Sequence, residues 1–245
     1  MMEELLPESV VAVESHGDDG AGEASLYPEE LAVVSRAVSK RRREFASVRV
    51  CARRAMEKLG VAPGPVLPGE RGAPRWPAGV IGSMTHCEGY AAAALVRAGE
   101  LASLGIDAEP HLALPDDVLE AVALPGEADR LDRLGAQAPA VHWDRLLFSA
   151  KESVYKAWFP LTGQWLDFSE ADIDITLDPA PAAGAPTGGL RARLLVPGPV
   201  VDGVRVRTFT GRWTVRHGLV ATTVTVPCST PGPASGAVPG SGSEA

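Results

Sequence analysis

Cysteine is scarce in this chain of 245 residues. The three cysteines, Cys51, Cys87 and Cys228, are far apart and odd in number. They have neither the close spacing of a zinc site nor the even count of a disulfide framework, so we expect three reduced thiols.

Long apolar runs are also lacking. No segment approaches the roughly 20 apolar residues that a membrane-spanning helix needs. The chain opens with acidic residues rather than with a basic stretch and an apolar run, so we expect no signal peptide. These absences predict a cytoplasmic protein without membrane contact.

Helical and strand-like segments alternate in a way that predicts an α+β fold. Helical segments are expected over 28–60, with a break near Ser39, and around Glu152. We expect strands in two groups, at 10–13, 80–84, 90–96 and 101–107, and then at 173–177, 190–196, 204–210 and 212–226, the last broken at His217-Gly218. A hairpin through residues 97–100 would join two strands of the first group. We therefore divide the chain into lobes at 1–111 and 112–228, followed by a disordered tail at 229–245 that is rich in Pro, Gly and Ser.

The most informative segment contains Glu152 and Lys156. They stand four residues apart in a stretch without Gly or Pro, so a helix would place them on one face. Apolar residues flank that face at helical spacing on both sides: Trp143, Leu147, Ala150, Val154 and Trp158 form one stripe, and Phe148, Tyr155 and Phe159 form the other. Charges held between two buried stripes are costly unless they meet a partner or ligand, so we expect them to line a crevice.

A second acidic pair lies on a predicted strand. Asp107 and Glu109 alternate with Leu104, Ile106 and Ala108, so the two carboxylates point to one face, roughly 7 Å apart. Such a pair is also found on solvated edge strands. With Glu152 as a third carboxylate, it would form a site for Mg²⁺ and a phosphate.

Positive charge is concentrated in one helical segment. Residues 36–58 hold nine Lys or Arg against Glu44 and Glu57, a local balance of +7 in a chain of net charge −8. The segment could be a solvated surface, a nucleic-acid site or an anion site for a nucleotide phosphate. Nucleic acid is disfavoured because the rest of the chain is acidic and no aromatic platform accompanies the arginines.

The ordered motifs resemble those of a known family. Gly105-Ile106-Asp107-Ala108-Glu109, followed by residues 148–156 (FSAKESVYK), is similar to the two-part signature of the 4'-phosphopantetheinyl transferases. The resemblance covers roughly residues 29–226 and includes KRRREF at 40–45, GSMTHC at 82–87, HWD at 142–144 and WFPLT at 158–162. It is closest to the Sfp-type branch and its actinobacterial PptT-like members.

The resemblance implies a fold and a reaction. The expected fold is two similar α+β lobes related by a pseudo-two-fold axis in one monomer, with the active site between them. The expected reaction moves 4'-phosphopantetheine from coenzyme A to a serine of an apo acyl or peptidyl carrier protein. Its other product is adenosine 3',5'-bisphosphate. The carriers would belong to fatty-acid, polyketide or peptide synthases.

The resemblance also implies residue roles. Mg²⁺, or Mn²⁺, would be held by Asp107, the Ala108 carbonyl, Glu109 and Glu152, with Glu152 alternatively the general base. Lys156 would stabilise or protonate the leaving phosphate. The remaining coenzyme A contacts would come from Arg41 and Arg49 at the 3'-phosphate, Gly69, Glu70 and Arg71 in the adenine loop, Thr85 and His86 at the adenosine and phosphate, and Lys151 at the phosphate chain.

Two other functions share these residues. One is a non-catalytic protein that binds coenzyme A or another nucleotide. The other is a metal-dependent phosphohydrolase of coenzyme A, in which water replaces the serine hydroxyl.

Overall fold

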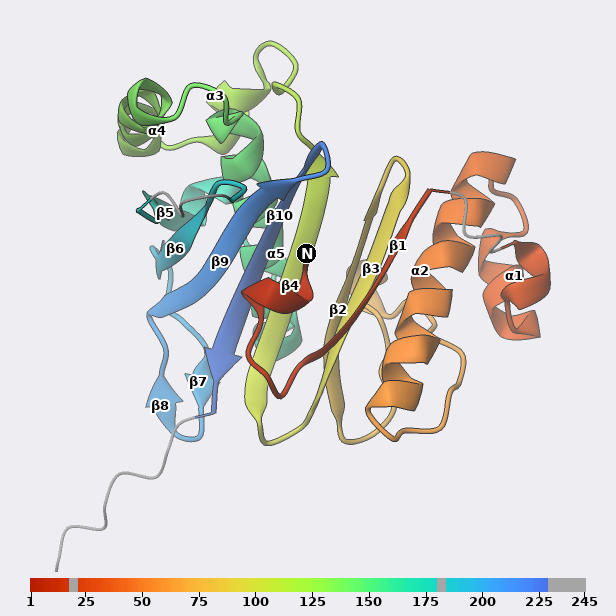
Figure 1. Cartoon of the computed structure of the whole chain (residues 1–245). Coiled ribbons are helices and arrows are strands. Elements are labelled where there is room, and N and C mark those ends of the chain that lie inside the picture. Colours follow the sequence, from red (N-terminus) through yellow and green to blue (C-terminus); the bar gives the residue numbers. More distant parts are fainter. Residues whose placement is uncertain (18–21, 180–183, 229–245) are drawn as a thin grey trace, which may run out of the picture.

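The computed structural model describes residues 1–17, 22–179 and 184–228. The predicted disordered tail at 229–245 lies outside the described residues. Two antiparallel sheets, each covered by a long helix, stand side by side (Figure 1). This arrangement confirms the α+β prediction.

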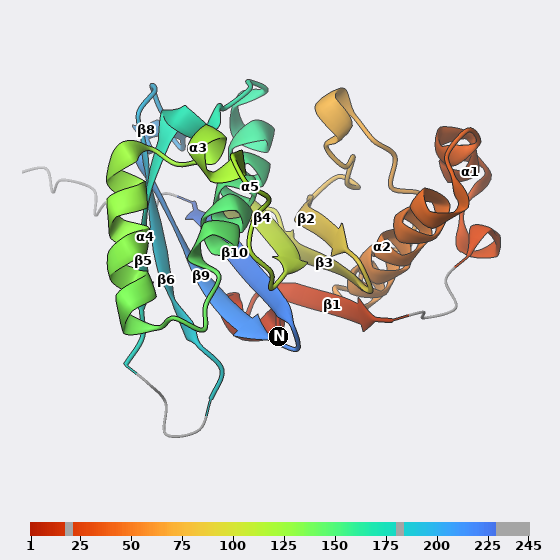
Figure 2. The same ribbon diagram turned by 90° about the horizontal axis from the view of Figure 1, so that it is seen from above.

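The first sheet has three strands in the order β1-β3-β2, namely β1 Val11–His16, β2 Val80–Cys87 and β3 Tyr90–Arg97. Helix α2, Ser39–Lys58, covers it, and the short α1, Pro28–Val34, lies beyond α2 (Figure 2). Helix α2 presents an apolar stripe to the sheet, with Val48, Ala52 and Met56 buried. The chain turns after α2 at Gly60, whose φ of +71° suits a residue without a Cβ.

The second sheet has five strands in the order β4-β10-β9-β6-β5. They are β4 Leu101–Pro110, β5 Ala171–Leu177, β6 Thr187–Leu194, β9 Thr208–Arg216 and β10 Leu219–Pro227. The long helix α5, Trp143–Thr162, packs against this sheet, and α3, Val118–Val122, and α4, Pro125–Gln137, lie farther along the same side (Figure 2). A small hairpin, β7 Val200–Val201 and β8 Val204–Arg205, and four short 3₁₀ helices complete the elements of the described residues.

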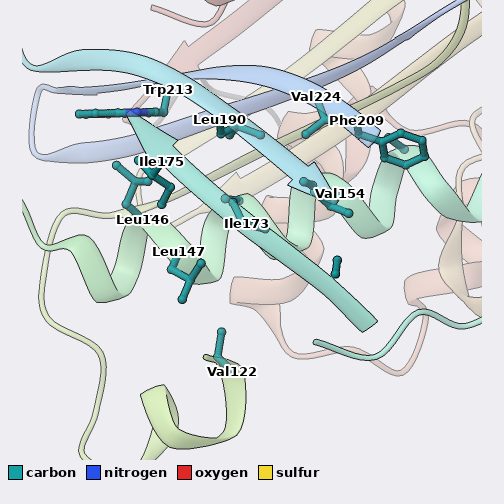
Figure 3. Packing of buried hydrophobic residues seen from close by; sticks show 14 of the residues in the cluster. Val122, Leu146, Leu147, Val154, Ile173, Ile175, Leu190, Phe209, Trp213 and Val224 are labelled. Atoms are coloured by element: carbon teal, nitrogen blue, oxygen red, sulfur yellow. The ribbon is translucent and has the colours of Figure 1, made fainter. Parts of the chain in front are cut away.

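The larger hydrophobic core lies between α5 and the five-stranded sheet (Figure 3). Leu146 and Val154 of the helix pack with Ile173, Leu190 and Trp213 of the strands. The helix also lies close to the backbone of β4 at Gly105. A Cβ at this position would lie only 2.0 Å from the Ser153 carbonyl oxygen, so the approach requires a glycine. The core therefore fixes which face of α5 is left for other contacts.

Two strand predictions were wrong. The expected hairpin through residues 97–100 is not formed: β3 belongs to the first sheet, and β4 crosses to the second sheet and pairs with β10 from Ser103 to Pro110. The expected strand over 204–210 is divided into β8 and the start of β9. Local sequence marks the turn at Gly99, but the pairing partner of β4 lies more than a hundred residues away.

The two sheets meet where β2 passes β4. The side chains of β2 bridge this seam: Ser83 Oγ accepts a hydrogen bond from the Ile106 N–H at 3.0 Å, and Thr85 Oγ1 accepts one from the Ala108 N–H at 3.2 Å. The alternating pattern of β4 therefore brings Asp107 to the boundary between the two sheets, although β4 is hydrogen-bonded into the second one.

Among the described residues, no helix is both long and apolar enough to cross a membrane.

Candidate active site

A cleft of about 800 Å³ opens between α2, β2 and α5. Its charged lining is mostly basic, with Glu152 as the acidic member beside Arg41, Arg49, Arg71, His86 and Lys156. Phe45, Tyr155 and Phe159 add aromatic surface. A basic cleft with apolar walls suits an anionic ligand that also carries apolar groups.

Helix α5 places Glu152 and Lys156 in this cleft, one turn apart. The Lys156 ammonium donates to Asp107 Oδ1 at 2.7 Å and to the Ile106 carbonyl oxygen at 3.2 Å. Asp107 is buried, with 4% of its surface exposed, and Thr85 Oγ1 also donates to Oδ1 at 3.1 Å. The structure therefore joins the two sequence signatures, one on β4 and the other on α5.

The ionised carboxylates of Glu152 and Glu109 are energetically unfavourable in their surroundings. Burial raises the pKa of Glu152, and the nearby Asp107 raises it further while Lys156 opposes the shift. Burial and Asp107 likewise raise the pKa of Glu109, and Arg145 opposes that shift. Additional positive charge at this position would be stabilising.

The residues present fit a hard divalent cation in their chemistry. Asp107 Oδ2 is buried and has no hydrogen-bond partner among the described residues. An orphaned carboxylate oxygen is the kind of ligand that Mg²⁺ takes, with water and phosphate oxygens completing the shell. No group of three or more His, Cys, Asp or Glu side chains in the described part of the chain is arranged to hold a metal ion, so the three carboxylates do not form a preformed cage. Glu109 instead accepts from Arg145 Nη1 at 3.0 Å.

Arg41 and His86 meet across the cleft, with Arg41 Nη1 2.6 Å from His86 Nε2. Because a guanidinium only donates, Nε2 accepts and the ring is neutral in this contact. Burial lowers the pKa of His86, and Arg41 lowers it further. The structure thus brings Arg41 and His86, two residues predicted to contact coenzyme A, together in the cleft lining.

Arg49 lies at the base of the cleft, 6% exposed. Its guanidinium stands 3.1 Å from the centre of the Phe45 ring and donates to the carbonyl oxygens of Val66 and Phe45. Burial lowers the pKa of Arg49 to about 10, although the fully buried Glu30 opposes this shift. An anion in the cleft would compensate this desolvated charge.

The predicted adenine loop lines the cleft with Pro68, Gly72, Ala73 and Pro74 and with one charged side chain, that of Arg71. Arg71 has a positive φ of 51° and stands 5.5 Å from the centre of the Trp165 ring. The described lining includes neither Gly69 nor Glu70. The loop is closed at its base by a bridge between Pro68 and Pro74 and by the Gly69 N–H, which donates to the Ala73 carbonyl oxygen at 2.6 Å.

Two residues predicted to contact coenzyme A are engaged by the protein itself. Thr85 Oγ1 donates to Asp107 Oδ1 and accepts from the Ala108 N–H, and Thr85, like Asp107 and Glu109, is not among the described residues that line the cleft. Lys151 is buried and bonded to Glu127 and to two carbonyl oxygens.

Sequence reasoning missed Arg145 and Glu30. Arg145 precedes Glu152 by seven residues, two helical turns, and this spacing could have indicated a shared face. Glu30, in the first turn of α1, is fully buried, where it pairs with Arg53 at 3.1 Å and lies 4.0 Å from Arg49.

Comparisons with known proteins identify the family of this chain. A family model of the 4'-phosphopantetheinyl transferase N-terminal domain matches residues 29–96, and that of the 4'-phosphopantetheinyl transferase superfamily matches residues 103–194. The chain belongs to this superfamily of transferases. The second match includes all of the Asp107 signature, which agrees with the pairing of β4 into the second sheet.

Three relatives specify the branch. The chain is 54% identical to the 4'-phosphopantetheinyl transferase Svp of Streptomyces mobaraensis, over 100% of this chain and 96% of that protein. It is 48% identical to PptT of Mycobacterium tuberculosis over 80% of this chain and 84% of that protein. It is 43% identical to Npt of Nocardia iowensis over 91% of this chain and 99% of that protein. The chain is thus an Sfp-type member close to the actinobacterial PptT-like proteins.

Proposed function

We propose that this chain transfers the 4'-phosphopantetheine group of coenzyme A to a serine hydroxyl of apo acyl or peptidyl carrier proteins, with Mg²⁺ as the metal and Mn²⁺ as an alternative. The supporting observation is that Glu152 and Lys156 line the basic cleft and that the Lys156 ammonium is bonded to Asp107 Oδ1. Membership of the transferase family supports the type of reaction.

The cleft suits coenzyme A in size and charge. A volume of about 800 Å³ lies within the range of cofactor sites. Arg41 lies near both His86 and Arg49, and these three side chains form one group for a phosphate, while Lys156 and Arg71 add further positive charge to the lining. The aromatic side chains Tyr155 and Phe159 offer apolar contact for the uncharged parts of the molecule.

Phosphoryl transfer requires positioning and charge stabilisation more than covalent chemistry by the protein. A metal held by Asp107, with Glu109 and the Ala108 carbonyl as further oxygen ligands, would neutralise charge that develops on the diphosphate. Lys156 donates hydrogen bonds to the leaving phosphate and so stabilises the bisphosphate product.

Glu152 acts as the general base in this proposal. Its raised pKa brings the carboxylate closer to the range in which it can accept the serine proton. The serine oxygen then bonds to the phosphorus atom of the pantetheine side, and the phosphorus–oxygen bond to the adenosine bisphosphate breaks. If Glu152 is instead a metal ligand, water carries the proton away.

Product analysis tests this function against its alternatives. The protein is incubated with coenzyme A and Mg²⁺, with and without an apo carrier protein, and adenosine 3',5'-bisphosphate is quantified by chromatography. Release that requires the carrier supports the transferase. Release without carrier indicates a phosphohydrolase, and binding of coenzyme A with no release from several carriers indicates a non-catalytic binding protein.

A further inference from the structure

Lys151 stands next to Glu152 in the signature but is enclosed by protein. Its side chain is 1% exposed, and its ammonium donates to the carbonyl oxygens of Phe168 at 2.8 Å and Ala171 at 2.6 Å and to Glu127 Oε1 at 2.8 Å. A lysine ammonium has three N–H donors. All three are therefore used, and a phosphate contact would require breaking this arrangement.

Glu127, the partner of Lys151, is equally enclosed, with its side chain 1% exposed. Its Oε1 also accepts from the Ile173 N–H at 2.6 Å, and its Oε2 accepts from the Leu124 N–H at the start of α4 at 2.7 Å. The ion pair thus connects three elements: the middle of α5, the first turn of α4 and the start of β5.

The position of this ion pair bears on the direction of the catalytic side chains. Neighbouring residues on an α-helix point about 100° apart around its axis, so fixing Lys151 toward α4 and β5 also fixes the direction of Glu152. Lys156, one turn beyond Glu152, shares its face. A rotation of α5 about its axis would move both side chains relative to Asp107.

Hydrogen bonds on another face of α5 hold the helix close to the five-stranded sheet. Ser153 Oγ donates to the Thr222 carbonyl oxygen at 3.1 Å, and Ser103 Oγ donates to the Ala157 carbonyl oxygen at 2.7 Å. These contacts hold α5 against β10 and β4. On the side of α5 that faces α4 and the start of β5, the Lys151–Glu127 pair adds a polar contact to the hydrophobic core.

We propose that Lys151 and Glu127 are a positioning pair that sets the rotation of α5, so that Glu152 and Lys156 meet Asp107, and that Lys151 makes no contact with coenzyme A. The proposal rests on the transfer reaction proposed above for its catalytic consequence. The lack of contact with coenzyme A stands independently of that reaction.

Lysine footprinting tests the lack of contact on the unmodified protein. The folded chain is treated briefly with acetic anhydride, with and without saturating coenzyme A, and acetylation is quantified by peptide mass spectrometry. Lys151 should remain unlabelled in both samples, while the exposed Lys58 reacts equally in both. Labelling of Lys151 that coenzyme A suppresses would overturn the proposal.

Paired substitutions test the positioning role. Removal of one partner leaves a buried unpaired charge, so the informative variant is Glu127→Met with Lys151→Met, which removes both charges. Lys58→Met is the matched control at an exposed lysine. Coenzyme A affinity is measured by calorimetry, and kcat and KM for the carrier are measured well below the melting temperature of each variant.

We expect the double variant to keep its affinity for coenzyme A within about twofold and to lose about tenfold or more in kcat, because misplaced catalytic groups slow the chemical step. A loss of affinity with unchanged kcat would assign Lys151 to the phosphate instead. Unchanged affinity and kcat would exclude a positioning role. If the double variant does not fold, footprinting still decides the contact. If the unmodified protein transfers nothing, the proposed function fails, whereas the footprint remains interpretable.

Discussion

The Lys156 ammonium lies 2.7 Å from Asp107 Oδ1, and this contact joins the signature helix α5 to strand β4. Asp107 Oδ2 has no hydrogen-bond partner among the described residues. One oxygen of this carboxylate is thus engaged by the protein, and the other lacks such a contact. Under the proposed function, Asp107 would stand between Lys156 and the metal.

Asp107→Asn tests this assignment. The amide keeps the shape but loses the charge that attracts a cation and orients Lys156. We expect the transfer rate to fall by about a hundredfold or more, in the range of losses on removal of one strong electrostatic contact. Initial rates of carrier modification over a range of Mg²⁺ concentrations measure the effect. Asp116→Asn, at an exposed position, is the control, and a wild-type rate with unchanged Mg²⁺ dependence in Asp107→Asn would contradict the assignment.

Glu152→Gln should separate catalysis from binding. A glutamine cannot accept the serine proton, so we expect transfer to fall by about 10²- to 10⁴-fold. Affinity for coenzyme A, measured by calorimetry, should change little, because arginines, a histidine and Lys156 provide most of the charged lining. Glu57→Gln, on the exposed side of α2, is the control. Near-wild-type transfer by Glu152→Gln would remove this residue from the mechanism.

The same variant should be more stable than the wild type at neutral pH. Burial raises the pKa of Glu152, so the ionised carboxylate is less favourable in the folded chain than in the unfolded chain. The cost is present at a pH above the folded pKa and disappears as the pH falls below the ordinary value near 4.5. Glu152→Gln should therefore raise the melting temperature at pH 7 and lose this advantage near pH 4. A melting temperature at pH 7 no higher than that of the wild type would be inconsistent with this account.

Arg49→Met should weaken coenzyme A binding. Arg49 is a desolvated cation at the base of the cleft, and an anionic ligand recovers part of the cost of burying it. We expect a loss of about tenfold or more in affinity, as for the loss of a charged hydrogen bond. Calorimetry at a temperature where the variant is folded provides the measurement. Arg54→Met, exposed on the same helix, should bind normally, and equal affinities of the two variants would argue against Arg49 as a ligand.

Gly105→Ala should destabilise the protein through the contact between β4 and α5. The added Cβ would lie 2.0 Å from the Ser153 carbonyl oxygen, so the helix must move or the strand must bend. We expect a loss of about 1–3 kcal/mol in the free energy of unfolding, measured by denaturant titration. Gly64→Ala, where a Cβ meets no atom within 4 Å, is the control. Equal stability of the two variants would show that the close approach has no energetic weight.

Local patterns in the sequence predict much of the site. The spacing of Glu152 and Lys156 and the apolar stripes beside them predict a buried helix with one charged face, which α5 shows. The alternation around Asp107 predicts a strand, which is β4. The basic helix and its termination just before Gly60 follow from the composition of a single segment.

Long-range contacts explain what the sequence did not predict. The partner of β4 is β10, and no local signal distinguishes that pairing from a hairpin with β3. Lys151 and Lys156 share one signature, yet one is buried against Glu127 and the other faces the cleft. The packing of α4 and β5 against α5 is what encloses Lys151, whereas Lys156 lies on the part of α5 that faces the cleft. Thr85 and Arg145 likewise take their functions from neighbours on other strands and helices.

The most direct test of the central claim is the intact mass of an apo carrier protein after incubation with this chain, coenzyme A and Mg²⁺. We predict a gain equal to one phosphopantetheinyl group, absent with EDTA and with Asp107→Ala. An unchanged carrier mass across acyl and peptidyl carriers, in the presence of measurable coenzyme A binding, would contradict the account.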